Sequence, residues 1–137
     1  MRRTFDQKVA LPSPAARSSA MSLILVVDDE FGILELLEAA LTDEGHRVLT
    51  AMNGRLALDR MMAERPDLVI TDLLMPFMGG AELLEAISAR ADLGTIPTIM
   101  MSSLLESAVA ERCSGYAAFV RKPFRIAALL DLVESFA

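Results

Sequence analysis

The sequence predicts an α/β fold in which a five-stranded parallel sheet is doubly wound, with helices on both faces. Short apolar runs alternate with longer amphipathic stretches five times between residues 22 and 137. The apolar runs lack polar alternation, which is typical of strands buried on both faces of a parallel sheet. Strand–helix units repeated in this way favour right-handed crossovers around one sheet. A chain of 137 residues suits a single domain of this kind.

The five predicted strands are the short apolar runs. The first, "LILVV", is a continuous Leu/Ile/Val segment that ends in acidic residues. The others have the same character, and several end in polar side chains. The predicted strands cover residues 23–27, 46–51, 67–71, 96–102 and 117–120.

The predicted helices are the amphipathic stretches between and after these runs. The first carries apolar residues at helical spacing and meets Gly45, a residue that commonly ends helices. Its predicted apolar face consists of Phe31, Leu34, Leu37 and Leu41. The second opens at Asn53 and is closed by Pro66. The predicted helices cover residues 31–45, 53–66, 79–90, 104–113 and 125–136.

Residues 1–21 differ from the rest of the chain and are predicted to be a mobile leader. The segment mixes Arg, Ser, Ala and Pro without strand or helix periodicity. It also lacks the apolar core of a secretory signal. Its composition faintly resembles an organellar transit peptide, and an alternative start at Met21 explains the segment equally well. The predicted domain therefore spans residues 22–137.

Composition narrows the class of protein. The net charge of −6 comes without a basic stripe, which disfavours nucleic acid as a partner. No apolar run approaches the ~20 residues of a membrane span, and a single cysteine, Cys113, forms no internal disulfide. We therefore expect a cytoplasmic protein that binds neither nucleic acid nor a membrane. Cys113 and the single histidine, His46, receive no catalytic role.

Polar groups follow four of the predicted strands, at the edge where ligands bind in open parallel sheets. These residues are Asp28, Asp29, Glu30, Thr71, Asp72, Ser102, Ser103, Arg121, Lys122 and Pro123. Three converging aspartates repel one another unless a cation joins them, and an oxygen-rich set suits Mg²⁺. The alternative is that the paired acids Asp28 and Asp29 only cap the first helix, which leaves Asp72 unexplained.

These groups also fit phosphoryl transfer. A carboxylate beside Mg²⁺ can act as a nucleophile toward phosphorus, and Lys122 and Ser102 could hold the phosphoryl oxygens. Pro123 permits a cis peptide bond at Lys122, a form largely confined to X-Pro bonds, which would turn the ammonium back over the strand ends.

Four motifs in order, "LVVDDE", "VITDLLMPFMGGAELLEAI", "IMMSS" and "FVRKPF", resemble the receiver domain of two-component response regulators. The resemblance covers residues 22–137 and implies a flavodoxin-like fold with strand order 2-1-3-4-5. It implies that Asp72 accepts a phosphoryl group from a phosphohistidine on a histidine kinase or histidine phosphotransfer protein. The implied Mg²⁺ ligands are Asp29 directly, Asp28 through water, Asp72, and the backbone carbonyl of Leu74.

The resemblance also implies the switch residues. Ser102, preferred over Ser103, corresponds to the switch hydroxyl, and Lys122 to the lysine that pairs with Asp72 and then with its phosphate. Phe119 occupies the switch-aromatic position but has no hydroxyl, so it can respond only through packing.

Two further departures from the family pattern affect neighbouring segments. Gly79 stands where the family most often has Asp or Asn, which predicts a looser cap on the following helix and a more mobile loop after Asp72. The segment between Ser102 and Gly115 is about two residues shorter than is usual in the family, which predicts a short fourth helix and puts the usual partner surface in question.

The function expected from this resemblance is that of a single-domain response regulator, which switches conformation on phosphorylation to signal to a protein partner. It would catalyse its own phosphorylation without being a turnover enzyme. The alternatives are a phosphorelay intermediate, a phosphate sink, or a phosphorylation-independent interaction module. A phosphatase of the haloacid dehalogenase type is disfavoured because Leu74 occupies the position of its second aspartate.

Overall fold

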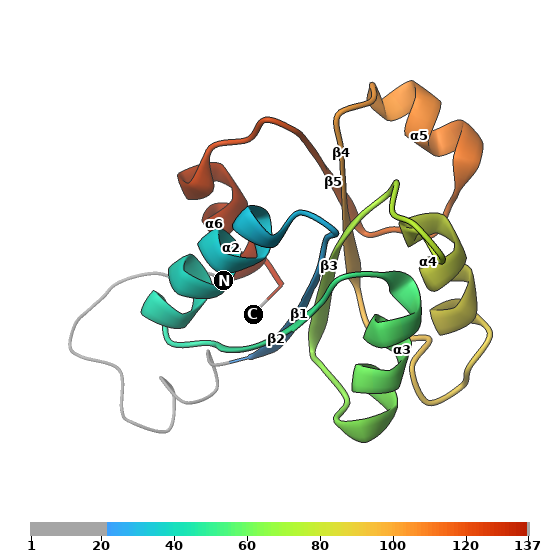
Figure 1. The fold of residues 1–137 in the computed structure, drawn as a ribbon, viewed down its shortest axis with the longest axis horizontal. Helices are drawn as coiled ribbons and strands as arrows, with labels where there is room; N and C mark the ends of the chain where they lie inside the picture. Colours follow the sequence, from blue (N-terminus) through green and yellow to red (C-terminus); the bar gives the residue numbers. More distant parts are fainter. Residues whose placement is uncertain (1–21, 137) are drawn as a thin grey trace.

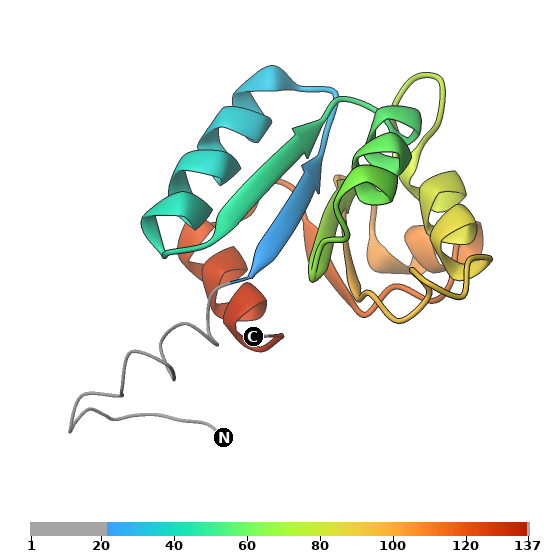
Figure 2. The same cartoon turned by 90° about the horizontal axis from the view of Figure 1, so that it is seen from below.

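The computed structural model describes residues 22–136 and shows one parallel sheet between two layers of helices (Figure 1 and Figure 2). The predicted leader, residues 1–21, lies outside the described residues. Strands and helices alternate along the chain, as the apolar pattern predicts. The elements are β1 (Leu23–Val27), α2 (Phe31–Asp43), β2 (Arg47–Ala51), α3 (Gly54–Ala63), β3 (Leu68–Asp72), α4 (Gly80–Ser88), β4 (Thr98–Ser102), α5 (Glu106–Arg112), β5 (Ala118–Arg121) and α6 (Ile126–Glu134).

The sheet has the order β2-β1-β3-β4-β5, and every neighbouring pair is parallel. This confirms the predicted fold class and strand order. Because β1 and β3 are central neighbours, with Val27 opposite Thr71, the segments that follow them leave the sheet side by side. Parallel pairing places the carboxyl ends of all five strands at one edge of the sheet.

The two faces of β1 explain why its sequence is apolar without alternation. Ile24 and Val26 pack against α2 and α6 in one buried cluster. Leu25 and Val27 pack on the opposite face, in a second cluster with residues of α3 and α4. Helix α5 contributes one buried residue, Val109, to a third cluster that also contains Met100 of β4. A strand covered on both faces has no position left for a polar side chain.

The helix ends follow the expected local chemistry. The side chain of Asn53 accepts a hydrogen bond from the backbone N–H of Leu56 (2.9 Å), so it caps α3 as predicted. Gly45, just beyond α2, has φ +96°, a conformation that favours glycine. The fourth helix in chain order, α5, has seven residues and is indeed short.

The prediction that Phe31 belongs to the buried face of the first helix is wrong. Leu34, Leu37 and Leu41 of α2 are buried, but Phe31 is 62% exposed. Phe31 is the first residue of α2, and it lines a surface hollow together with Leu34 and Ala51. Within residues 22–136, no helix combines the length and apolar composition required to cross a membrane.

Candidate phosphoryl-acceptor site

Three aspartates meet at the carboxyl edge of the sheet. Asp28 directly follows β1, Asp29 is next in the chain, and Asp72 is the last residue of β3. One carboxylate oxygen from each lies within 4.8 Å of the others. Asp28 is fully buried and Asp72 is 8% exposed, whereas Asp29 is exposed to solvent. Neighbouring parallel strands thus bring together the acids that the sequence predicts.

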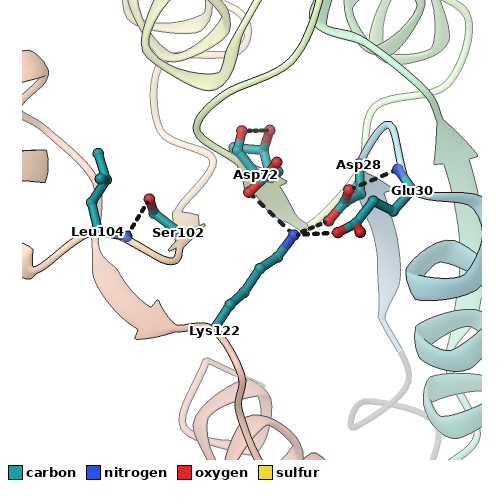
Figure 3. A network of polar contacts seen from close by, with 7 residues as sticks. Asp28, Glu30, Asp72, Ser102, Leu104 and Lys122 are labelled. Carbon is teal, nitrogen blue, oxygen red and sulfur yellow. Dashed lines mark hydrogen bonds and ion pairs between the residues drawn. The ribbon is translucent and has the colours of Figure 1, made fainter.

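Lys122 joins this cluster from the end of β5, as Figure 3 shows. Its Nζ lies 2.7 Å from Oδ2 of Asp28 and 3.3 Å from Oδ1 of Asp72. The peptide bond between Lys122 and Pro123 is cis, the form that the sequence led us to expect. The backbone N–H of Lys122 also donates to the carbonyl oxygen of Ser102 (2.8 Å), which ties the lysine to β4.

Glu30 is a contact that the sequence did not predict. Its Oε1 lies 3.3 Å from Nζ of Lys122, so the ammonium faces a third carboxylate (Figure 3). The Glu30 side chain is exposed, and an exposed ion pair of this kind adds little stability. The adjacency of Glu30 to the two aspartates was the available signal, but the direction of a long exposed side chain cannot be predicted from its position alone.

Local hydrogen bonds orient the buried acids. Oδ1 of Asp28 accepts a hydrogen bond from the backbone N–H of Glu30 (2.9 Å). The backbone N–H of Asp28 donates to the carbonyl oxygen of Ala51 (3.1 Å). The N-cap residue of α2 is Glu30, and it makes no side-chain cap bond. The first helix therefore does not use Asp28 or Asp29 as its N-cap, and helix capping does not account for their presence.

The charge balance of the cluster shifts two pKa values. Burial, followed by the charge of Asp28, raises the pKa of Asp72 to about 6, although Lys122 opposes this. Burial acts to lower the pKa of Lys122, but its hydrogen bond to Asp28 and the charges of Asp72 and Asp28 outweigh burial and raise it. Lys122 is therefore a permanent cation at neutral pH, and Asp72 is mostly ionised.

The loop after Asp72 is shaped by two glycines. A Cβ at Gly80 would collide with the carbonyl oxygen of Asp72, so glycine allows α4 to begin directly against the end of β3. A Cβ at Gly79 would lie 2.8 Å from the carbonyl oxygen of Leu73. The N-cap of α4 is Gly79, and its N–H donates to the Glu82 carboxylate (2.9 Å). The cap thus keeps the contact made by Glu82 and lacks only a side chain at position 79; the mobility of the loop remains a prediction.

Ser102 lies on β4, the neighbour of the strand that ends in Asp72, and Phe119 lies on β5, the strand that Lys122 follows. Ser102 ends β4 and is buried, and its Oγ accepts from the backbone N–H of Leu104 (3.1 Å). The rival hydroxyl, Ser103, is exposed. Phe119 of β5 is half-buried and packs against the cluster that contains Met100 and Val109. The predicted switch residues therefore occupy the expected strands, with the Ser102 hydroxyl engaged locally.

Comparison with known proteins decides the family. The profile of the response regulator receiver domain matches residues 24–134. The chain belongs to the response regulator receiver family. The receiver is 35% identical over 115 residues to sporulation initiation phosphotransferase F of Bacillus subtilis, covering 82% of this chain and 91% of that protein. It is 34% identical to a response regulator of Mycolicibacterium vanbaalenii, of which it spans 46% while 78% of this chain is covered.

Solved structures agree with this assignment. A chemotaxis response regulator of Vibrio cholerae superimposes with a TM-score of 0.80 at 28% identity, covering 85% of this chain and 99% of that one. The receiver domain of a sensor histidine kinase of Pseudomonas aeruginosa gives a TM-score of 0.78 at 25% identity, over 84% and 96% of the two chains. That domain holds a magnesium ion in its active-site cleft.

The donor set of the receiver fits a divalent metal ion. Asp28, Asp29 and Asp72 provide three carboxylates within a few ångströms of one another, against the single ammonium of Lys122. The pocket therefore keeps an excess of negative charge beside Lys122, to which Glu30 adds, and such an excess suits one hard dication that prefers oxygen ligands. Leu74, whose carbonyl was predicted as a further ligand, lies in the loop two residues after Asp72, and its ligand role remains a prediction.

Proposed function

We propose that this receiver accepts a phosphoryl group on Asp72 and uses the change in charge to signal to a protein partner. The donor would be the phosphohistidine of a histidine kinase or histidine phosphotransfer protein, and the setting the cytoplasm. One observation supports this above the rest: a nearly buried carboxylate stands 3.3 Å from a lysine ammonium and beside two further aspartates. Such a cluster serves no packing purpose and costs stability.

The chemistry uses the groups at the strand ends. An oxygen of Asp72 attacks phosphorus in line with the P–N bond of the donor, which breaks and leaves its electron pair on the imidazole. Asp72 acts in its ionised form, which predominates above its pKa of about 6. Lys122 supplies positive charge beside the transferred oxygens. A Mg²⁺ ion held by Asp28, Asp29, Asp72 and the Leu74 carbonyl would neutralise further oxygen charge when bound.

The switch follows from the added charge. Phosphorylation replaces the single negative charge of the Asp72 carboxylate with a phosphoryl group that carries about −1.5 to −2, a net change of about −0.5 to −1, and brings new acceptor oxygens next to Lys122. Ser102, at the end of β4, would donate its hydroxyl to these oxygens, and its Oγ would give up the hydrogen bond that it accepts from the Leu104 backbone. Phe119, half-buried against Met100, would repack in the space that this movement opens.

The receiver would catalyse its own phosphorylation and dephosphorylation without acting as a turnover enzyme. Its similarity to sporulation initiation phosphotransferase F, of which it spans 91%, favours a phosphorelay intermediate as the second candidate. A phosphate sink is the third. The lifetime of the phosphorylated form separates them, because a sink turns over quickly whereas an adaptor keeps its phosphoryl group.

The direct test is labelling with a small phosphoryl donor such as phosphoramidate. We expect Mg²⁺-dependent labelling of the wild-type receiver and of Asp131→Asn, an exposed control on α6. We expect no labelling of Asp72→Asn, and none in the presence of a chelator. Persistent labelling of Asp72→Asn would show that the acceptor is another residue. An unchanged NMR spectrum on adding Mg²⁺ with a beryllium fluoride phosphoryl analogue would favour a phosphorylation-independent module.

A further inference from the structure

Phe77, in the loop after β3, has a backbone conformation that phenylalanine rarely adopts. Its φ is +68°, and among the described residues it is the one non-glycine residue with a positive φ. The backbone N–H of Met78 donates to the carbonyl oxygen of Pro76 (2.8 Å). Phe77 is therefore the central residue of a γ-type turn with positive φ, a rare and strained form. A bulky side chain makes this conformation more costly still.

The packing of the free protein does not compensate for this strain. Phe77 is 91% exposed, so its ring gains almost nothing from burial. Its neighbours behave differently, since Met75 and Met78 pack against a buried core cluster. The carbonyl oxygen of Met78 also accepts a hydrogen bond from Gly54 (2.8 Å). The loop is thus fixed on both sides of Phe77, and this fixation holds the aromatic ring out in solvent.

The position of the loop indicates what covers the ring. Phe77 lies five residues after Asp72, at the edge where phosphoryl transfer takes place. Transfer requires the donor imidazole to reach a carboxylate that is only 8% exposed. The protein surface around that imidazole must therefore close over the loops that border Asp72. A small phosphoryl donor has no such surface and needs none of these loops.

The same edge carries more exposed apolar surface. Leu74 lies in the loop of Phe77, and Leu105 lies in the loop after β4, the sheet neighbour of β3. Both are more than half exposed. Exposed aromatic residues surrounded by other apolar groups are typical of the few residues that dominate a protein interface.

We propose that Phe77 is the aromatic anchor with which the receiver holds its protein phosphodonor. The partner it fits presents a phosphohistidine with apolar side chains beside it. This inference rests on the proposed function of Asp72 and adds a specificity-determining residue outside the catalytic cluster. It predicts that removing the ring raises the stability of the free protein, because strain is relieved. The same change should slow transfer from the kinase, because contact area is lost in the complex.

The experiment compares Phe77→Asn and Phe77→Tyr with Met62→Gln. Asparagine tolerates positive φ, tyrosine keeps the ring, and Met62 is an exposed apolar control near the far end of α3. For each protein we would measure the unfolding midpoint, labelling by phosphoramidate, and transfer from a purified histidine kinase core, chosen from a panel because it phosphorylates the wild-type receiver.

We expect Phe77→Asn to raise the thermal midpoint by about 3 °C or more and to leave phosphoramidate labelling unchanged. Its kcat/KM for transfer from the kinase should fall about tenfold or more, mainly through KM. Phe77→Tyr should transfer like the wild type, and Met62→Gln should match it in both donor assays.

A lower midpoint for Phe77→Asn would show that the ring stabilises the free protein and would overturn the inference. Unchanged kinase transfer, or an equal loss with phosphoramidate, would overturn it as well. A receiver that phosphoramidate labels on Asp72 but that no kinase phosphorylates would overturn the anchor and leave the acceptor assignment intact. Absence of labelling on Asp72 would instead refute the proposed function.

Discussion

Replacing Asp72 with asparagine should stabilise the receiver when no divalent ion is present. Burial and the charge of Asp28 raise the pKa of Asp72 to about 6, against an ordinary value of 3.8. Ionising this carboxyl therefore costs the folded state more than the unfolded state. A displacement of this size corresponds to about 3 kcal/mol once both states are ionised. The pKa of about 6 already includes the opposing attraction of Lys122, so we expect neutral asparagine to gain about 2–3 kcal/mol near neutral pH.

The pH dependence gives a stricter test than the gain itself. A group with a raised folded pKa favours folding below its unfolded pKa, and this contribution is lost as the pH rises through the folded pKa. About half of the cost is already present near pH 5, and nearly all of it near pH 7.5. The free energy of unfolding of the wild type should thus fall by about 1.5 kcal/mol relative to Asp72→Asn between these two pH values.

The assay is urea denaturation with a chelator at both pH values, with Asp131→Asn as the exposed control. The control should follow the wild type at each pH. A constant difference between the wild type and Asp72→Asn would refute the argument, and so would a variant that is less stable at neutral pH. Adding Mg²⁺ should raise the stability of the wild type more than that of Asp72→Asn, because a bound ligand stabilises the state that binds it.

Two further changes test the geometry of the site. Gly80→Ala should cost at least about 2 kcal/mol in urea unfolding, because its Cβ would collide with the carbonyl oxygen at the end of β3; Gly32→Ala in α2, which has open space, should instead gain up to about 1 kcal/mol, and equal effects would contradict the steric argument. Lys122→Ala should cost about 2–4 kcal/mol at neutral pH with chelator present, because it leaves the fully buried Asp28 without its cation. A loss no larger than that of the exposed Arg121→Ala would contradict the buried ion pair.

The fold and the central acids could be predicted because both depend on patterns that burial imposes. β1 is apolar throughout since its two faces contact different helix layers. Once the parallel sheet is inferred, Asp28, Asp72 and Lys122 must lie at one edge, because each ends or follows a strand. No detailed side-chain geometry is needed for that step.

The remaining features depend on individual conformations that the pattern does not specify. Helical spacing places Phe31 with Leu34, but the spacing does not show whether the first turn of α2 is covered, and there Phe31 is exposed. Glu30 reaches Lys122 through the choice of one rotamer. The positive φ of Phe77 runs against residue preference, since such positions favour glycine or asparagine. A reading based on preferences cannot find a residue that violates them.

The position of Lys122 explains how a single phosphoryl group could move the receiver between two states. Its ammonium is shared unequally, at 2.7 Å from Asp28 and 3.3 Å from Asp72. In the unphosphorylated protein the fully buried Asp28 thus holds the shorter contact. Phosphorylation would replace the single negative charge of the Asp72 carboxylate with a phosphoryl group of about −1.5 to −2, so negative charge would grow on the Asp72 side alone. The added charge would draw the ammonium from Asp28 toward Asp72. Because the backbone N–H of Lys122 donates a hydrogen bond to the carbonyl oxygen of Ser102, a shift of the lysine would carry over to the end of β4.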